Sequence, residues 1–390
     1  MSRKILFISS ITRYGGGERW MLDAAGGLKR RGCEVKLAAR PGSVLLDRAA
    51  AGGLDCAAIQ MQSDFDPAAI FKLTRLFRRF APDVVIPNLD REIRLCAAAL
   101  WAAGRRPLRR RAFPAPGGAR PSPARPFPRL IPRRGSDFPL KDKLHYRLVY
   151  TRAVHSVIVN SQATRRTMLS RTPWFPADKA VVIYNGIDAA LYDRLSGRRD
   201  EIRRTMRQSL GLPDSAALVT LVGELNERKG QQHVIEAAAA ILNERPESHF
   251  LFVGEGDARE RIAAELSSRG LGAAVHLLGF RPDVPEIVTA SDVLILPSRV
   301  EGFGYVLVEA MAAGLPVVAS RASSIVEVVE DGVTGLLHEV GESGAMAGQI
   351  IRLLSDRELA ASMGRAGRAR VERLFTLSRM LDELEAHCFG

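Results

Sequence analysis

The chain has 390 residues, of which 46% are hydrophobic, and a formal net charge of +13 at pH 7. This length favours two domains with separate cores, and no apolar run reaches the ~18 residues of a membrane-spanning helix. The apolar run after the basic N-terminus is too short for a signal peptide, and the four cysteines have no metal or redox spacing, so we expect a soluble protein of a reducing cytosol.

The first hundred residues alternate short β-branched runs with helical patterns. We predict strands over residues 4–9, 34–40, 58–62 and 83–88. Helices are predicted after the glycine turn "YGGGER" (14–19), over 67–82 and over 91–104. The second helix has one apolar face, formed by Leu73, Leu76, Phe77 and Phe80. This alternation is typical of a parallel sheet with right-handed crossovers.

The pattern breaks at residues 104–134, where a further strand is due. The segment contains ten Arg, eight Pro and no acidic residue, and removing its ten positive charges from +13 leaves +3. Its prolines argue against a strand or a helix. We favour an artefact of a shifted reading frame in a GC-rich gene, which would leave the first domain one strand short. A basic loop that binds anionic lipid stays open, whereas no aromatic ladder supports a nucleic-acid partner.

The rhythm resumes with strands at 156–161 and 179–188. A second series of strands is predicted over 217–223, 249–256, 274–280, 293–298, 316–320 and 335–340. The domains are therefore an N-terminal Rossmann-like domain (1–188), a polar linker (189–215), a C-terminal domain (216–370) and a final helix (371–390) expected to return to the first domain. Doubly wound sheets bind ligands at the carboxyl ends of their strands, so we expect a site in a cleft between the domains.

One glycine-rich turn follows the predicted strand 293–298, in the stretch "EGFGYVLVEAMAAGLP" (301–316). The turn consists of Glu301, Gly302, Phe303 and Gly304. Glu309 falls in the second turn of the helix that follows. Glycines allow a ligand to approach the backbone, and free N–H groups at a helix start attract phosphate. One ligand could place phosphate on these amides and hydroxyl groups on both carboxylates. The alternative is two solvated charges that the helix dipole favours.

Two further loops follow the first strand of each domain. Arg228 and Lys229, in "VGELNERKG" (222–230), stand just before a helix, where they either contact phosphate or form a plain basic turn. Gly16 and Gly17, in "RYGGGERWM" (13–21), either accept an anion or sugar on their amides or make a tight turn. There is no nucleophile triad, no P-loop and no metal-ligand spacing, so no metal site is predicted.

Together these motifs resemble a known family. The segments "GGGER", "NGID", "RKG", "FVGEGDARERI", "LLGFRPDV", "ASDVLILPSRVEGFGYVLVEAMAAGLPVVAS" and "EVVEDGVTG" are similar to those of the retaining GT-B glycosyltransferases of family 4. The resemblance is dense over 181–376, weaker over 1–100 and 135–180, and absent over 104–134. It implies an α/β fold of two Rossmann-like doubly wound domains facing a central cleft. It also implies transfer of a sugar from a nucleotide-sugar donor to a glycan or lipid-linked acceptor, with retention of anomeric configuration.

The resemblance further implies roles for residues. Glu309 would bind the ribose hydroxyls of the donor. Glu301 and the backbone of Phe303 and Gly304 would face the donor sugar and its phosphate. Lys229 would stabilise the leaving diphosphate, so Lys229 and Glu301 are the expected catalytic residues. The other expected donor-binding residues are Gly16, Gly17, Arg228, Phe280, Arg281 and Gly302, with the base near Phe280 and Arg281. The family usually works without a metal, and we expect no cofactor.

The chain departs from the family pattern at two places. Glu224 stands where many members have Arg, and Arg228 could supply the missing charge. Many members also have a His after the fourth strand, a place that Asn88 or Asp90 could fill. These departures leave a degenerate nucleotide-sugar-binding protein as one alternative. A glycogen-phosphorylase-like or sucrose-phosphate-type enzyme on the same fold is another, marked by a pyridoxal-binding lysine for which the sequence shows no context. We expect a cytoplasmic enzyme of cell-envelope polysaccharide, lipopolysaccharide or glycolipid synthesis, with peripheral contact to the inner membrane face left open.

Overall fold

The computed structural model describes residues 3–104, 128–135 and 138–390. The chain divides into two compact units. Unit 1 runs to Tyr184 and also includes Met380–Gly390, whereas unit 2 is Asn185–Arg379. The segment 189–215, predicted to be a linker, lies wholly within unit 2.

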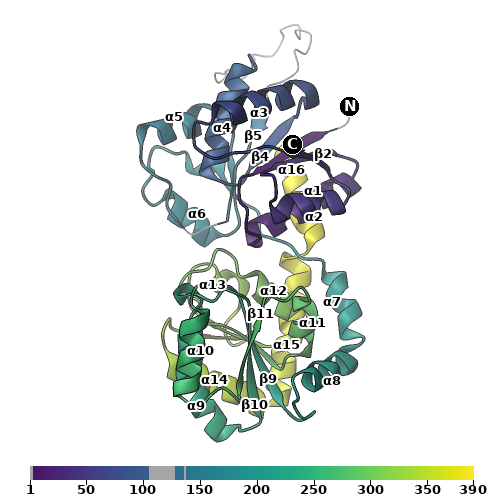
Figure 1. Cartoon of the computed structure of the whole chain (residues 1–390), viewed down its shortest axis with the longest axis vertical. Coiled ribbons are helices and arrows are strands. Elements are labelled where there is room, and N and C mark those ends of the chain that lie inside the picture. The colour runs from purple at the N-terminus through teal and green to yellow at the C-terminus, as the bar shows by residue number, and fades with distance from the viewer. Residues whose placement is uncertain (1–2, 105–127, 136–137) are drawn as a thin grey trace. The chain divides into compact units, whose positions relative to one another are not determined.

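Unit 1 contains two parallel sheets (Figure 1). The first has the order β3-β2-β1-β4-β5, and its strands are β1 (Lys4–Ser9), β2 (Glu34–Ala39), β3 (Asp55–Ala58), β4 (Val84–Pro87) and β5 (Arg129–Leu130). The second has the order β6-β7-β8, made of β6 (Arg133–Arg134), β7 (Val157–Val159) and β8 (Ala180–Val182). The helices are α1 (Gly16–Arg30), α2 (Val44–Ala51), α3 (Pro67–Phe80), α4 (Asp90–Ala102), α5 (Leu144–Arg152) and α6 (Gln162–Leu169).

The alternation of side chains along β1 explains how this sheet is covered on both faces. Leu6 and Ile8 belong to the core that contains Phe77 of α3, while the ring of Phe7 meets that of Trp20 of α1 edge-on, with centroids 6.2 Å apart. The side chains of Leu6, Ile8 and Phe77 are fully buried. A parallel sheet buried on both faces reads as a continuous apolar run, and "ILFI" in β1 has that character.

One strand and one helix in the first sixty residues of unit 1 differ from the prediction. The third strand is β3, Asp55–Ala58, and not residues 58–62, and α2 was missed altogether. The sequence of β3, "DCAA", has low β propensity, and the strand forms at the sheet edge because it pairs with β2. Helix α2 begins at Ser43, whose hydroxyl accepts a hydrogen bond from the Leu46 N–H at 3.3 Å.

The prediction that the first domain lacks a strand is wrong. Residues 129–130 form β5, which pairs with β4, and 133–134 form β6, which pairs with β7. Leu130 and Ile131 are fully buried. The prolines flank these short strands instead of interrupting them, since Pro128 precedes β5 and Pro132 lies between β5 and β6. The rest of the Arg/Pro-rich segment, 105–127, lies outside the described residues, and so do the lipid-binding and reading-frame interpretations that concern it.

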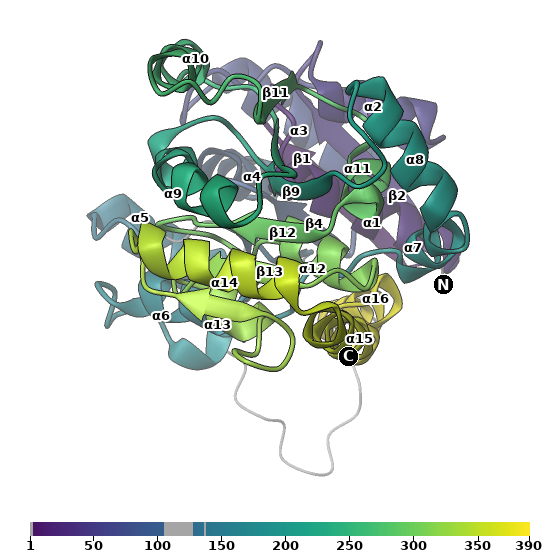
Figure 2. The same cartoon turned by 90° about the horizontal axis from the view of Figure 1, so that it is seen from below.

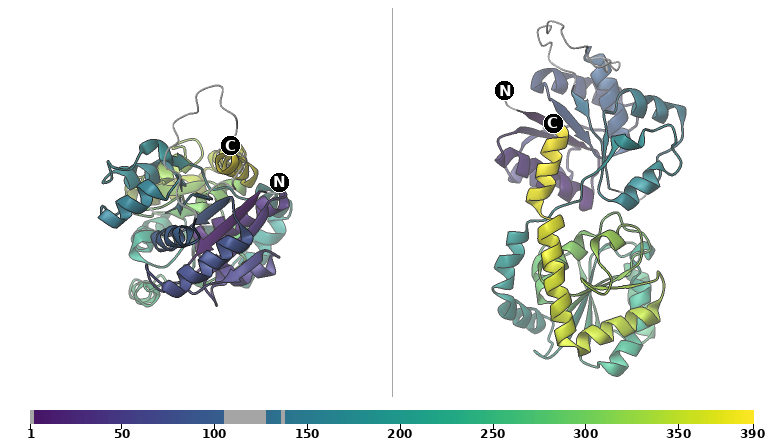
Figure 3. Two further views of the ribbon diagram at one scale, coloured as in Figure 1. Left: turned by 90° about the horizontal axis from the view of Figure 1, so that it is seen from above. Right: turned by 180° about the vertical axis from the view of Figure 1, so that it is seen from behind.

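Unit 2 contains one parallel sheet of order β11-β10-β9-β12-β13-β14 (Figures 1 and 2). Its strands are β9 (Ala217–Val222), β10 (Ser248–Val253), β11 (Val275–Gly279), β12 (Val293–Leu296), β13 (Val317–Ser320) and β14 (Leu336–His338). Its helices are α7 (Ala189–Ser196), α8 (Arg199–Ser209), α9 (Gln231–Glu244), α10 (Arg259–Ser268), α11 (Val284–Ala290), α12 (Tyr305–Ala312), α13 (Ile325–Val328), α14 (Ser343–Ser355) and α15 (Arg357–Leu374). Helix α15 is labelled in Figure 1, and the right-hand view of Figure 3 shows it from behind as a long yellow-green helix.

The predicted linker forms α7 and α8, which belong to the core of unit 2. Met206 of α8 packs with Leu218 of β9 and Ile287 of α11. Arg207 is 2% exposed and donates to Asp292 at 2.8 Å, and the same carboxylate accepts from the Leu218 N–H. The sequence pattern did not predict this packing because most residues of α8 are polar. Only one apolar stripe and one paired arginine of the helix are buried.

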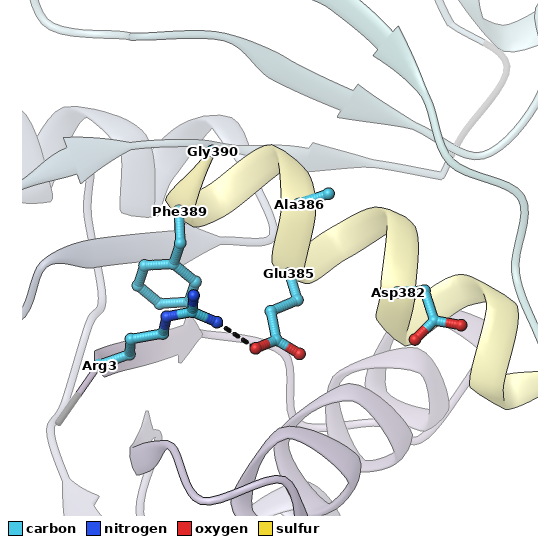
Figure 4. Close-up of a pocket in the computed structure, with 6 residues that line it drawn as sticks. All are labelled: Arg3, Asp382, Glu385, Ala386, Phe389 and Gly390. Atoms are coloured by element: carbon cyan, nitrogen blue, oxygen red, sulfur yellow. Dashed lines mark hydrogen bonds and ion pairs between the residues drawn. The ribbon is translucent and has the colours of Figure 1, made fainter.

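The C-terminal residues dock on unit 1 through α16 (Leu377–Phe389), as Figure 4 shows. The guanidinium of Arg3 pairs with Glu385 and lies 5.0 Å from the centroid of the Phe389 ring. Arg31 pairs with Asp382 at 2.7 Å. These contacts join both ends of unit 1. No described helix has the length and apolarity that a bilayer crossing requires.

Candidate active site

The expected site residues of unit 2 gather where the sheet changes its winding direction. Strand β9 is followed in the chain by β10 on one side of it, whereas β12 lies on its other side and is followed by β13. Ligand sites of doubly wound sheets lie at such a switch point, beyond the carboxyl ends of the strands. Lys229 belongs to the loop after β9, and Glu301 to the loop after β12.

These two residues form a buried ion pair. Lys229 Nζ lies 2.5 Å from Glu301 Oε2, and the side chains are 12% and 13% exposed. Burial raises the pKa of the Glu301 carboxyl, but the charges of Lys229 and Arg228 outweigh burial, so the pKa lies below its usual value. Glu301 is therefore a carboxylate at neutral pH, and the site holds a cation and an anion side by side.

Close backbone packing fixes the loop that carries Lys229. Asn226 caps the short helix Glu227–Lys229 by accepting from the Lys229 N–H at 3.2 Å. The next residue, Gly230, has φ of +76°, and a Cβ there would lie 2.2 Å from the Pro297 carbonyl oxygen. Only glycine allows the two loops to approach this closely. The Arg299 N–H also donates to the Arg228 carbonyl at 2.9 Å, which ties the two loops together.

The glycine turn ends at the start of α12. Gly304 has φ of +80° and is the residue before the helix. Glu309 is 4% exposed although every other residue from Val306 to Ala312 is apolar and buried. The buried ring of Phe303 packs edge-on against the ring of Phe375, with centroids 5.6 Å apart. A carboxylate held in an otherwise apolar buried helix makes Glu309 a candidate functional residue.

The remaining predicted residues of unit 2 lie near strand ends without joining the Lys229–Glu301 pair. Phe280 follows β11 and is 65% exposed. Arg281 donates twice to Asp283, at 2.7 and 2.5 Å. Arg228 is exposed and contacts the Val300 carbonyl at 3.4 Å. Glu224, the departure from the family pattern, is also exposed and accepts from the Asn226 amide at 2.9 Å.

In unit 1, the predicted glycines begin α1. Gly16 and Gly17 form its first turn, next to the buried Glu18. Asn88 donates from its side-chain amide to Glu18 Oε1 at 3.0 Å, and a Cβ on Gly17 would lie 3.0 Å from the same nitrogen. Of the two candidates to replace the family's histidine, Asn88 is therefore the one that touches the glycine turn. Asp90 instead accepts from the Tyr150 hydroxyl at 2.7 Å.

Sequence reasoning missed Arg133 and Arg134, which it placed in the anomalous segment. Arg133 is 4% exposed and lies over the Trp20 ring at 5.2 Å. Its Nη1 would lie 3.4 Å from a Cβ on Gly17, so it borders the glycine turn. Arg134 donates to Asp90 at 3.0 Å. The apolar pair Leu130–Ile131 was the sequence feature that could have predicted a buried strand immediately before these arginines.

Glu92 gives unit 1 a pH-dependent stability. Its carboxylate accepts from the Ser10 N–H at 2.6 Å and from the Leu89 N–H, and burial raises its pKa from 4.5 to about 7. Between these values the native carboxyl holds a proton that the unfolded chain has lost. Stability therefore falls as pH rises from about 4.5 to 7, in total by on the order of 3 kcal/mol.

Glu92→Gln is expected to flatten this part of the pH profile, because the amide does not titrate. All three tryptophans lie in unit 1, so tryptophan fluorescence in urea at several pH values follows this unit alone. Asp47→Asn, at an exposed position of α2, is the matched control. An unchanged slope in Glu92→Gln would assign the pH dependence to other groups.

The two doubly wound parallel units, with the Lys229–Glu301 pair at the switch point of the second sheet, define the GT-B class of fold that the sequence predicts. Comparison with known families gives the same result. Residues 14–191 match the family model Glycosyltransferase Family 4, and residues 202–370 match Glycosyl transferases group 1. The two matches together span most of the chain, which belongs to this family of GT-B glycosyltransferases.

Individual relatives match over part of their length. The N-acetyl-alpha-D-glucosaminyl L-malate synthase of Bacillus anthracis is 32% identical over 203 residues, which are 52% of this chain and 51% of the relative. The alpha-D-kanosaminyltransferase of Streptomyces kanamyceticus is 31% identical over 195 residues, 49% of this chain and 50% of the relative. The alignments thus cover about half the length of these curated relatives.

Solved structures match over the whole chain at lower identity. HepE from Anabaena, in complex with UDP and glucose, has a TM-score of 0.79 at 24% identity and covers 99% of each chain. A glycosyltransferase from Rickettsia africae has a TM-score of 0.84 at 18% identity and covers 99% of this chain and 98% of its own. At these identities the likeness concerns the fold.

Proposed function

We propose that the protein is a retaining glycosyltransferase that moves a sugar from a nucleotide-sugar donor to a glycan or lipid-linked acceptor. The observation that carries this proposal is the buried Lys229–Glu301 pair at the switch point, beside a glycine turn that opens α12. The family supports it, and so do the names of two relatives, an N-acetyl-alpha-D-glucosaminyl L-malate synthase and an alpha-D-kanosaminyltransferase.

The chemistry expected of this site is charge neutralisation at a leaving diphosphate. Lys229 is the only lysine among residues 185–379, and its ammonium can exchange Glu301 for the more highly charged diphosphate. Glu301 then becomes free to accept hydrogen bonds from donor-sugar hydroxyls. Gly302, Phe303 and Gly304 offer backbone N–H groups at the start of α12 for phosphate.

In the proposed reaction, the bond between the anomeric carbon and the phosphate oxygen breaks on the face where the acceptor hydroxyl attacks. The acceptor oxygen forms the new glycosidic bond and passes its proton to the leaving phosphate, so the configuration is retained. Lys229 and the amides of the glycine turn supply the positive charge, and no metal or other cofactor is needed. Transfer that survives EDTA would agree with this proposal, and transfer that requires a divalent ion would contradict it.

Gly16, Gly17, Phe280 and Arg281 stay candidates for donor contacts, with the exposed Phe280 ring offering a surface on which a base can stack. A cytoplasmic role in envelope polysaccharide, lipopolysaccharide or glycolipid synthesis belongs to the same proposal, as does peripheral contact with an anionic membrane. The second candidate, a nucleotide-sugar-binding protein without transferase activity, is favoured by the exposed acidic Glu224 where the family often has a cation.

A thermal-shift screen with UDP-, GDP- and ADP-sugars tests the proposal. We expect one nucleotide to raise the melting temperature of unit 2, and Lys229→Ala to remove that shift. Release of nucleotide from the stabilising donor in the presence of candidate acceptors then separates an enzyme from a binding protein. Stabilisation without any release or transfer would favour the binding protein, and no stabilisation by any of them would contradict both.

A further inference from the structure

A polar pocket lies within unit 1, beside the loop from Ser10 to Arg13 that leads into the glycine turn of α1. It has a volume of about 630 Å³ and is bordered by the ends of β1 and β4 and by the first turns of α4. Four basic side chains line it, namely Arg13, Arg91, Arg94 and Lys141. Two acidic side chains also line it, Asp64 and Asp90.

The arginine at the base of this pocket is buried and incompletely satisfied. Arg94 is 7% exposed, and its guanidinium lies 4.9 Å from the centroid of the Tyr146 ring. One nitrogen, Nη2, is 2.5 Å from Asp64 Oδ1, while Nε and Nη1 have no hydrogen-bond partner among the described residues. Buried guanidinium groups normally satisfy most of their five N–H donors, so this arrangement leaves capacity for a further acceptor.

The two acids of the pocket differ in their availability. Asp90 lines the pocket but is already paired with Arg134 at 3.0 Å and with the Tyr150 hydroxyl at 2.7 Å. Asp64, which is 48% exposed, lies in the loop before α3. Its Oδ1 is 2.5 Å from Arg94 Nη2 and also 3.8 Å from Arg91 Nε. A single carboxylate oxygen of a surface loop thus sits between two guanidinium groups, and positive charge remains in excess.

We propose that this pocket binds an oxyanion, a phosphate or carboxylate group, of the acceptor substrate, and that Asp64 occupies the place of this anion when the acceptor is absent. Arg94 and Arg91 bind the anion by charge-assisted hydrogen bonds, and Lys141 and Arg13 add long-range attraction. The identity of the carrier as the acceptor rests on the proposed function, whereas the binding of an anion does not.

Isothermal titration calorimetry with inorganic phosphate, and separately with malonate, tests the proposal at constant ionic strength. We expect at least one of the two to bind with a Kd on the order of millimolar, and their ratio to distinguish phosphate from carboxylate. Arg94→Gln and Arg91→Gln should each weaken binding about tenfold or more, since each removes a charged hydrogen bond. Lys141→Gln, at an exposed position, should weaken it about threefold without a risk to folding.

Two controls locate the binding. Arg75→Gln, exposed on α3 and not part of the pocket lining, should leave the Kd unchanged. Lys229→Ala should also leave the Kd unchanged, which separates this pocket from the predicted donor site.

Asp64→Asn removes the carboxylate that competes with the anion, and this variant should bind the anion severalfold more tightly. Equal or weaker binding in Asp64→Asn would overturn the competition that we assign to Asp64.

The proposal is overturned if neither anion gives saturable binding up to about 50 mM, far above the millimolar range. It is also overturned if Lys229→Ala abolishes binding while Arg91→Gln, Arg94→Gln and Lys141→Gln retain it. Anion binding in this pocket without any sugar transfer would establish the pocket and refute the proposed function. Sugar transfer without anion binding in the pocket would support the proposed function and refute the anion site.

Discussion

Lys229→Ala is expected to lower kcat for sugar transfer by on the order of 10³, as found when a group that stabilises transition-state charge is removed. The reason is that the leaving diphosphate loses the ammonium that neutralises it. The measurement is initial rate of nucleotide release with a saturating donor. Arg261→Ala, at an exposed position of α10, is the matched control for the loss of one positive charge.

The same substitution carries a cost in stability, which a second variant separates from the effect on catalysis. Without Lys229, the carboxylate of Glu301 stays buried and unpaired, and breaking a buried pair from one side costs roughly 3–5 kcal/mol. Lys229→Ala combined with Glu301→Gln removes both charges, so circular dichroism should show most of the stability restored. Activity should stay low. Recovery of activity together with stability would show that Lys229 is structural and would refute its catalytic role.

Glu309→Ala is expected to lower kcat/KM for the donor by about 10²–10³, mainly through a higher donor KM. The carboxylate is proposed to accept hydrogen bonds from two ribose hydroxyls, and a hydrogen bond to a charged group is worth about 1.5–3 kcal/mol. Because the ribose does not react, ground state and transition state lose this binding alike, so kcat changes less than KM. Steady-state kinetics with varied donor concentration measures the split.

Two further variants decide whether Glu309 acts on the ligand or only on the fold. Glu309→Gln keeps the side-chain volume inside α12 and should show an intermediate loss of donor affinity. Glu358→Gln, in the exposed first turn of α15, should leave the kinetics unchanged. A donor KM in Glu309→Ala equal to that of the unaltered protein would contradict the ribose-binding role, whatever happens to its melting temperature.

Most of the fold could be predicted because hydrophobic periodicity is strong where strands are buried on both faces. The strands β1, β9, β10 and β12 consist mainly of buried apolar residues, and the prediction places each of them correctly. The prediction failed at β3, which is a sheet edge of weak propensity, and at α7 and α8, which are polar. It failed again at β5 and β6, where two-residue strands carry no period that a sequence pattern can reveal.

The candidate site was predictable in its residues but not in its contacts. Glycine turns after strands mark Lys229, Glu301 and Glu309, because doubly wound sheets place ligands at those ends. That Lys229 and Glu301 pair with each other is a property of the sheet order, which makes β9 and β12 neighbours although 72 residues separate the two side chains. No local pattern contains that neighbourhood.

The sequence by itself determined that the chain forms two doubly wound units and which loops are candidates for a binding site, since apolar periodicity and glycine turns act over a few residues. Tertiary structure alone decided which groups meet and which are buried. Glu309 is a buried carboxylate. Arg133 and Arg134 are buried in unit 1, although they belong to the Arg/Pro-rich segment that the sequence pattern did not assign to the fold. The physical reason is that burial, pairing and the pKa shifts they produce depend on strand order and packing across tens of residues, which no local pattern records.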